Sequence, residues 1–358
     1  MKPTKALHDL GQSLWIDDIT RDMLDNGTLQ RYIDDLSVTG LTSNPTIFDN
    51  AVAKSNSYDA EIKCLHKAGY SGEALFFELA LEDLSRAADM FLPIYHRTAT
   101  VDGYVSLEVS PLIAYDTEAT VADAKRLFAR AHKPNLFIKI PGTKEGLPAI
   151  EEAIYSGISV NVTLLFSSEH CMAAADAYMK GLERRVADGL CPDIRSVASV
   201  FVSRWDRAVA DKVPAELKDK LGIAVVHKAY RDYRALLDTD RWQRLESLGA
   251  RPQRLLFAST GTKDPKASDT LYVSELAAPN TVNTMPDKTL QAFADHGTLD
   301  GALTADGGDS EETLAAFEKA GISVSGLAAQ LQTDGAASFV KSWEDLLQSI
   351  ETKSKALG

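Results

Sequence analysis

The sequence predicts an α/β fold in which eight parallel strands and their intervening helices close into a (β/α)₈ barrel. Eight short runs of apolar or β-branched residues end in a polar residue or a turn, and helical patterns separate them. Strands that alternate with helices pair in parallel through right-handed crossovers, and eight such units close most naturally into a TIM barrel. A doubly wound open sheet is the alternative architecture.

The expected strands carry apolar or β-branched residues at most positions. In chain order they cover 13–17, 38–42, 104–109, 135–140, 157–162, 197–202, 254–259 and, most weakly, 281–284. One helix between them is well marked, because Met172, Ala175 and Met179 recur at spacings of three and four. That helix is expected over 168–185, with Ser167 capping its start.

All 358 residues are expected to form one barrel domain with two helical additions. No linker rich in Pro, Gly or Ser divides the chain, and no repeat recurs at a fixed period. The stretch of about 48–102, after the second strand, is expected to hold at least two amphipathic helices, one of them over 72–91. The tail of about 310–358 is expected to add two helices, near 311–320 and 335–350, packed on the barrel.

The composition is that of a folded globular protein, with 45% hydrophobic and 25% charged residues. Lys and Arg total 38 against 51 Asp and Glu, and the net charge of −13 disfavours nucleic acid as a partner. Three cysteines without CxxC spacing indicate neither a disulfide framework nor a zinc site. No apolar segment resembles a signal peptide or a membrane span, so we expect a cytoplasmic protein without a membrane partner.

Lys139 is a charged residue within the apolar run 136–140. In a barrel it would point inward near the C-terminal end of its strand, where barrel enzymes place their reacting groups. Desolvation there would lower the pKa of the amine, which could then attack a ketone and form a Schiff base, an electron sink for breaking a C–C bond. A lysine whose stem follows the strand end out to solvent is the alternative.

Polar residues also recur at the ends of the other expected strands. An aldol cleavage needs an amine, an acid/base pair for proton transfer and neutral donors that hold sugar hydroxyls. The candidates for these roles are Asp17, Asn44, Glu108, Asn161, Thr163, Ser199 and Arg204. Together with Lys139 they supply each type of group.

Local structural roles are alternatives for several of these residues. Asp17 and Asp18 could cap a helix that starts at the next residue, and Asn44 before a proline could mark only a turn. Thr163 alone is a common strand residue. Glu108 is harder to explain structurally, because a buried carboxylate without a lysine or water partner is unfavourable.

Arg204 and the loop 259–263 are the candidates for holding a phosphate. The loop reads Ser-Thr-Gly-Thr-Lys, so small residues let backbone N–H groups approach phosphate oxygens, and Lys263 or Arg204 supplies charge. It follows the seventh expected strand, where barrels often hold phosphate. The loop beginning at Ser259 lacks the P-loop spacing, so nucleotide binding is not indicated, and a solvated turn is the alternative.

Other chemistries find no support in the sequence. The seven histidines form no HExxH pair, so a metal site is not expected. No GxSxG motif occurs, and no GxGxxG follows the first strand. Serine hydrolase and dinucleotide-dependent activities therefore lose their main sequence signals.

Six motifs, in order along the chain, resemble those of the transaldolase family. They are Trp-Ile-Asp-Asp at 15–18, Gly-Leu-Thr-Ser-Asn-Pro-Thr-Ile at 40–47, Ser-Leu-Glu-Val at 106–109, Phe-Ile-Lys-Ile-Pro-Gly-Thr at 137–143, Asn-Val-Thr-Leu-Leu-Phe-Ser at 161–167 and Ser-Val-Phe-Val-Ser-Arg at 199–204. The resemblance covers about residues 9 to 300, and the tail is similar to that of the longer bacterial subgroup.

The resemblance implies a (β/α)₈ barrel of the non-oxidative pentose phosphate pathway. Such an enzyme would move a dihydroxyacetone unit from sedoheptulose 7-phosphate to glyceraldehyde 3-phosphate, giving erythrose 4-phosphate and fructose 6-phosphate. Sugar phosphates are the implied partners, no metal or organic cofactor is implied, and the expected state is a monomer or a homodimer.

By position, the resemblance assigns Lys139 to the Schiff-base lysine and Asp17 to the acid/base that acts on the C4 hydroxyl. It assigns Glu108 and Thr163 to the pair that positions a catalytic water. The remaining assignments are Asn44, Asn161 and Ser199 as hydroxyl-binding groups and Arg204 as a phosphate ligand.

One departure from the family pattern affects the phosphate site. Better-known members have Ser-x-Arg after the seventh strand, whereas here Ser259 is followed by Thr-Gly-Thr-Lys, so Lys263 would replace the arginine as a point cation.

Two other functions stay open. One is a lyase like fructose 6-phosphate aldolase, which uses free dihydroxyacetone, and the other is a barrel that binds sugar phosphates without catalysis.

Overall fold

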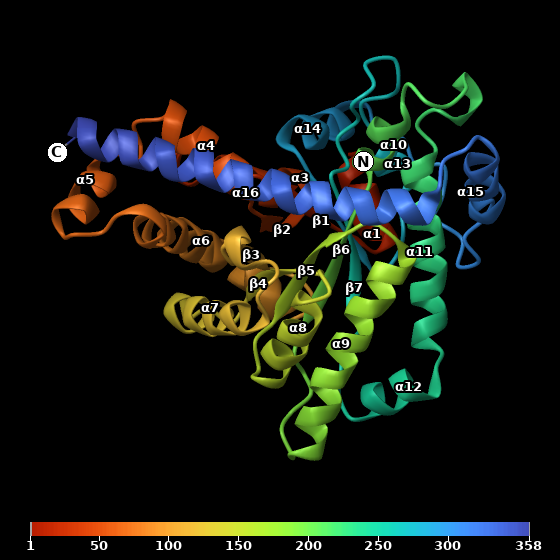
Figure 1. Cartoon of the computed structure of the whole chain (residues 1–358), viewed down its shortest axis with the longest axis horizontal. Coiled ribbons are helices and arrows are strands. Elements are labelled where there is room, and N and C mark those ends of the chain that lie inside the picture. Colours follow the sequence, from red (N-terminus) through yellow and green to blue (C-terminus); the bar gives the residue numbers. More distant parts are fainter. Residues whose placement is uncertain (1, 358) are drawn as a thin grey trace.

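A computed structural model describes residues 2–357, and a closed barrel of eight parallel strands forms its centre (Figure 1). The strands are β1 (Gln12–Asp17), β2 (Val38–Thr42), β3 (Val105–Glu108), β4 (Leu136–Pro141), β5 (Val160–Leu165), β6 (Ser196–Phe201), β7 (Arg254–Ala258) and β8 (Thr281–Met285). Neighbouring strands follow chain order, and β1 closes the barrel by pairing with β8. The predicted (β/α)₈ barrel is therefore confirmed, and the open-sheet alternative is wrong.

Helices surround the barrel. They are α1 (Pro3–Leu10), α2 (Arg21–Asp25), α3 (Thr28–Leu36), α4 (Pro45–Lys54), α5 (Asp59–Lys67), α6 (Gly72–Arg97), α7 (Thr117–Ala131), α8 (Gly146–Tyr155), α9 (Ser168–Ala187), α10 (Ser203–Val209), α11 (Leu221–Leu237), α12 (Asp240–Ser247), α13 (Leu271–Glu275), α14 (Asp287–His296), α15 (Ser310–Lys319) and α16 (Val324–Leu357), with 3₁₀ turns η1 (Pro111–Ile113) and η2 (Ala215–Leu217). Ser167 caps α9 as predicted, because its hydroxyl accepts a hydrogen bond from the His170 N–H at 3.2 Å. No helix within residues 2–357 combines the length and apolar character needed to cross a bilayer.

One strand begins three residues later than predicted. The sequence suggests a strand over 157–162, whereas β5 runs from Val160 to Leu165. Gly157 has a φ of +87°, and its N–H bonds back into the last turn of α8, so the chain completes a tight turn before it can extend. As a result Asn161 and Thr163 lie within the strand and not at its end.

Large aromatic side chains fill the half of the barrel that lies away from the C-terminal strand ends. The rings of Trp15 and Phe137 lie 6.1 Å apart, and Tyr104 stacks on Phe137 at 4.2 Å. Residues two apart on a strand face the same side. Asp17 therefore follows Trp15, and Lys139 follows Phe137, on the inner face of the barrel, so the polar end rests on a packed apolar layer.

The helical additions occur where the sequence places them, but α16 is longer than predicted. Helices α4, α5 and α6 lie between β2 and β3, and α15 is close to its predicted range. The second tail helix was expected over 335–350, whereas α16 has 34 residues, because its buried stripe already begins at Ala328 and Leu331. In Figure 1, α16 (blue) crosses the open end of the barrel, and it packs against α4, α5 and the end of β5.

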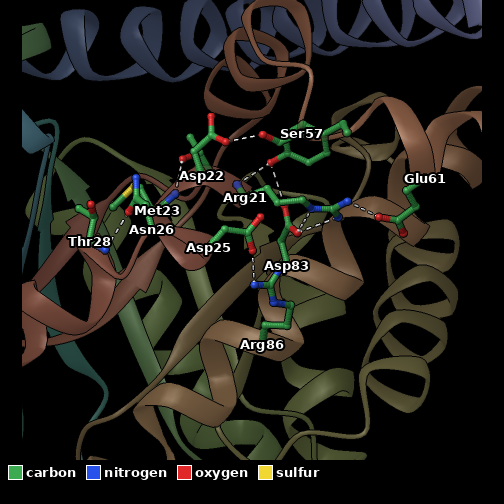
Figure 2. A network of polar contacts seen from close by, with 12 residues as sticks. Arg21, Asp22, Met23, Asp25, Asn26, Thr28, Ser57, Glu61, Asp83 and Arg86 are labelled. Carbon is green, nitrogen blue, oxygen red and sulfur yellow. Dashed lines mark hydrogen bonds and ion pairs between the residues drawn. The ribbon is translucent and has the colours of Figure 1, made fainter.

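A buried ion pair joins the start of α2 to α5 and α6, two helices of the insertion between β2 and β3 (Figure 2). Arg21 Nη2 lies 2.8 Å from Asp83 Oδ1 of α6, and the same guanidinium pairs with Glu61 of α5. The Tyr58 hydroxyl donates to Asp83 at 2.8 Å and accepts from the Arg21 N–H at 3.0 Å. Because Arg21 comes four residues after Asp17, this network fixes the path of the chain that leaves the end of β1.

Replacing Arg21 with Met is expected to lower the free energy of unfolding by about 3–5 kcal/mol, because Asp83 would stay buried without its charged partner. The matched control is Arg86→Met, which removes an exposed ion pair to Asp25 and should cost at most about 1 kcal/mol. Urea denaturation measures both changes. Equal losses for the two variants would contradict the importance of the buried pair.

Candidate active site

A cavity of about 300 Å³ opens at the C-terminal ends of the barrel strands. Eight of the site residues predicted from the sequence line this cavity: Asp17, Asn44, Lys139, Thr163, Ser199, Arg204, Ser259 and Lys263. The two other candidates, Glu108 and Asn161, are buried on the strands that flank Lys139. The fold therefore brings all ten candidates to the same end of the barrel.

Lys139 lies inside the mouth of the barrel. The residue is 5% exposed, and its Nζ lies 3.4 Å from Glu108 Oε2. The amine also donates a hydrogen bond to the Ser43 carbonyl at 3.2 Å. The alternative of a lysine that reaches outer solvent is wrong. An amine that is held by neighbours on one side and faces a cavity on the other is placed to attack a carbonyl group bound there.

Glu108 and Thr163 bring oxygen atoms to the neighbourhood of Lys139. Within residues 2–357 neither the Glu108 carboxyl nor the Thr163 hydroxyl has a hydrogen-bond partner, and Glu108 makes only the ion pair to Lys139. Burial raises the pKa of Glu108, and the charge of Lys139 offsets part of that rise. A carboxyl group with a raised pKa beside an amine can exchange protons with it or with a bound water molecule.

Asp17 ends β1 and lines the cavity. The Thr42 hydroxyl of β2 donates a hydrogen bond to its Oδ1 at 2.8 Å. Burial raises the pKa of Asp17, and the charge of Lys139 offsets part of that effect. The helix-capping alternative is wrong, because α2 begins only at Arg21 and its N-cap is Thr20.

Asp18→Asn is expected to stabilise the protein, and to do so more at pH 8 than at pH 5. Burial and the charges of Asp17 and Asp287 raise the pKa of Asp18 to about 6. Because this pKa exceeds the unfolded-state value, the stability that the protonated carboxyl contributes is complete at low pH and is lost as the pH rises through 6.

The asparagine variant never carries the unfavourable charge. Its free energy of unfolding should therefore exceed that of the wild type by about 1–2 kcal/mol at pH 8 and by less at pH 5. Urea denaturation at the two pH values checks the difference. A stabilisation that is larger at pH 5 than at pH 8 would contradict the assigned shift.

The side chains proposed to bind sugar hydroxyls differ in the hydrogen bonds that they make within the protein. Asn44 caps α4 by accepting a hydrogen bond from the Ile47 N–H at 3.1 Å, and its side chain also lines the cavity. Ser199 Oγ donates to Asn161 Oδ1 at 2.7 Å, and Asn161 Nδ2 donates to Ser106 Oγ at 3.1 Å. Asn161 thus lies behind Ser199 and orients its hydroxyl, which faces the cavity.

Besides Lys139, which pairs with Glu108, the cavity has two cationic side chains, Arg204 and Lys263, and neither of these has an ion-pair partner within the described part of the chain. The Arg204 guanidinium lies over the Phe201 ring, 5.0 Å from its centroid, and burial lowers its pKa. Lys263 reaches the cavity from the loop after β7, close to Ser259, which has a φ of +58°. Two cations without carboxylate partners at one cavity suit an anionic ligand.

Sequence reasoning missed several lining residues, of which Thr42, Phe201 and Phe339 matter most. Thr42 lies two residues before Asn44, so the strand period of two could have identified it. Phe201 belongs to the motif at 199–204, but an apolar residue in a strand does not by itself indicate a function. Phe339 comes from α16, far along the chain, and only the folded structure brings it beside Lys139.

Residues 2–357 contain no cluster of three or more His, Cys, Asp or Glu side chains arranged to hold a metal ion. The three cysteines are free, and of these only Cys171 is buried. The groups that line the cavity are two amines, one carboxyl, several hydroxyls, an amide and a guanidinium.

The sequence matches the family model described as Transaldolase/Fructose-6-phosphate aldolase over residues 14–350. A transaldolase of Thermobifida fusca (strain YX) is 46% identical, with 97% of this chain and 97% of that protein covered. A transaldolase of Arthrobacter sp. (strain FB24) is 45% identical, with 98% and 96% covered. Transaldolase 2 of Streptomyces coelicolor is 44% identical, with 99% and 97% covered.

Proposed function

Since this chain belongs to the transaldolase family, we propose that it transfers a dihydroxyacetone unit through a Schiff base on Lys139. The donor is sedoheptulose 7-phosphate, the acceptor is glyceraldehyde 3-phosphate, and the products are erythrose 4-phosphate and fructose 6-phosphate. The observation that carries the assignment of the amine is the position of Lys139, which is 5% exposed and faces the cavity beside the Glu108 carboxyl.

The first step joins the donor ketose to the enzyme. The Lys139 amine attacks the C2 carbonyl, and the resulting carbinolamine loses water to give a protonated imine. Loss of water needs a proton on the departing oxygen. Glu108 and Thr163 support this step, because none of their side-chain oxygens has a hydrogen-bond partner among residues 2–357, so they can hold a water molecule that relays the proton.

The second step breaks the C3–C4 bond. Asp17 takes the proton of the C4 hydroxyl, the aldehyde product leaves, and the electron pair of the broken bond passes into the imine to give a three-carbon enamine on Lys139. The raised pKa of Asp17 suits a group that takes up a proton here and returns it in the transfer step. Asn44 lines the cavity with an amide that can donate to a sugar hydroxyl, and Ser199, whose proton goes to Asn161, offers its oxygen as an acceptor.

The third step reverses this chemistry with the acceptor aldehyde. The enamine carbon attacks the aldehyde carbon, Asp17 returns its proton to the new hydroxyl, and water releases the ketose product from Lys139. The reacting groups lie at one cavity, and α16 completes its rim.

Because the C-terminal extension contributes to this cavity, we also propose that the barrel, its insertion and its C-terminal extension form one domain.

The phosphate of each sugar is proposed to bind at Arg204, Ser259 and Lys263. Arg204 can present a planar pair of donors, whereas Lys263 acts as a point charge in place of the arginine of better-known members. The Ser259 hydroxyl lies 2.8 Å from Ser203 Oγ, which orients it at the end of β7.

Lys263→Ala is expected to raise KM for phosphorylated acceptors about tenfold while changing the use of unphosphorylated glyceraldehyde little, because only the phosphate loses a charged contact. Steady-state kinetics with glyceraldehyde 3-phosphate and glyceraldehyde compare the two acceptors. Lys263→Arg serves as the control that keeps the charge. Equal losses with both acceptors would refute a phosphate role.

A coupled assay separates transfer from the two alternative functions. Fructose 6-phosphate is supplied with and without erythrose 4-phosphate, and release of glyceraldehyde 3-phosphate is followed. A transaldolase turns over rapidly only when the acceptor is present. Sustained turnover without acceptor, with equivalent release of dihydroxyacetone, would identify a lyase, and no turnover under either condition would leave a binding protein.

A further inference from the structure

The C-terminal helix α16 places an aromatic ring above the reacting amine. Phe339 lines the cavity, and its ring centroid lies 5.8 Å from Lys139 Nζ and 5.8 Å from Arg204 Cζ. Its ring also meets that of Phe201 edge to face, at 6.4 Å between centroids. With 7% of its surface exposed, Phe339 separates the amine from bulk water on this side.

Two contacts seat α16 closely on the barrel mouth near this ring. Gln332 Nε2 donates hydrogen bonds to the Gly142 carbonyl at 3.1 Å and to the Leu164 carbonyl at 2.9 Å, which ties the helix to the ends of β4 and β5. At Gly335 a Cβ atom would lie 3.0 Å from Leu164 Cδ2 and 3.3 Å from an Arg204 nitrogen. The glycine therefore allows the helix to approach the strand end.

The other half of α16 is anchored on the insertion helices. Trp343 Nε1 donates to Glu73 Oε1 of α6 at 2.8 Å, and its ring meets that of Phe76 edge to face at 4.9 Å. Further along, Lys353 pairs with Asp59 of α5. With contacts on both sides of Phe339, α16 forms a fixed cover of the cavity.

We propose that Phe339 determines the specificity for transfer over hydrolysis by keeping water away from the enamine on Lys139. This inference rests on the proposed function. The enamine has two fates: its carbon attacks the acceptor aldehyde, or it takes up a proton and the imine that results is opened by water. In the second case water adds to the imine carbon, the C–N bond breaks, and dihydroxyacetone and the free amine are released.

Removal of the ring changes the balance between these two fates. In Phe339→Ala a benzyl side chain is replaced by a methyl group, which leaves room for more than one water molecule above the imine carbon. Attack by the acceptor aldehyde does not require the ring itself. Phe339 does support Arg204, whose guanidinium lies over the ring, so transfer is measured at saturating erythrose 4-phosphate. Hydrolysis is therefore expected to gain on transfer when the ring is shortened.

The test compares Phe339→Ala with Phe339→Leu and with Phe317→Ala. Phe317, on α15, is a fully buried ring that packs in one apolar cluster with Phe339 but does not line the cavity. For each variant two rates are measured with fructose 6-phosphate: dihydroxyacetone release without acceptor, and transfer to erythrose 4-phosphate. Thermal melting reports whether each variant is folded, and the leucine variant keeps most of the apolar volume if the alanine variant does not fold.

The ratio of hydrolysis to transfer is expected to rise about tenfold in Phe339→Ala, less in Phe339→Leu and not at all in Phe317→Ala. Borohydride trapping of a three-carbon adduct is done in parallel on each protein. An unchanged ratio in a Phe339 variant that still forms the adduct would overturn the role of Phe339 alone. Absence of the adduct in the wild type would instead overturn the proposed function.

Discussion

Lys139→Ala is expected to lower kcat by at least about 10⁴-fold, to the level of the uncatalysed reaction, because the covalent route requires this amine. The substitution removes the partner of Glu108, the buried carboxyl 3.4 Å away. That carboxyl can take up a proton when it loses the lysine charge, so the barrel should remain folded. Transfer is measured with fructose 6-phosphate and erythrose 4-phosphate in a coupled assay, and circular dichroism confirms the fold.

The matched control is Lys180→Ala, which removes an exposed lysine of α9. It should keep the wild-type kcat. If the Lys139→Ala protein is folded and keeps more than about 1% of the wild-type kcat, another group forms the covalent intermediate.

Asp17→Asn is expected to lower kcat by about 10²–10⁴-fold, because the amide cannot take the proton from the C4 hydroxyl. The amine and the Glu108–Thr163 pair remain, so the donor sugar should still form its imine. Borohydride reduction followed by intact-mass analysis should therefore trap the whole six-carbon sugar phosphate on the variant, whereas the wild type yields a three-carbon adduct.

The neighbouring carboxyl provides the control for this result. Asp18 follows Asp17 directly but does not line the cavity, so Asp18→Asn should give the three-carbon adduct. If Asp17→Asn also accumulated the three-carbon adduct at a normal rate, cleavage of the C3–C4 bond would not depend on Asp17.

The barrel and its reacting end were predictable from sequence because both follow short-range rules. Strand runs alternate with helices, which fixes the architecture, and the period of two within a strand brings Lys139 inward two residues after Phe137. Charged residues inside such runs stand out against apolar neighbours, as Glu108 does. These signals need only a few adjacent residues.

The parts that the sequence did not reveal depend on contacts between distant segments. The start of β5 depends on the tight turn at Gly157 that follows α8. Strand propensity alone does not reveal this turn, which delays the strand until Val160. The length of α16 and the place of Phe339 depend on tertiary packing across the barrel mouth, and no local pattern links that ring to Lys139. The same holds for the Arg21–Asp83 pair, whose members come from separate helices.

Borohydride reduction of the wild-type protein with fructose 6-phosphate, followed by peptide mass mapping, shows which lysine forms the Schiff base. A single three-carbon adduct is expected on the peptide that contains Lys139, with no adduct on the peptide that contains Lys263. An adduct on any other lysine, or none after complete mixing with the donor sugar, would contradict the assignment of Lys139 as the covalent centre.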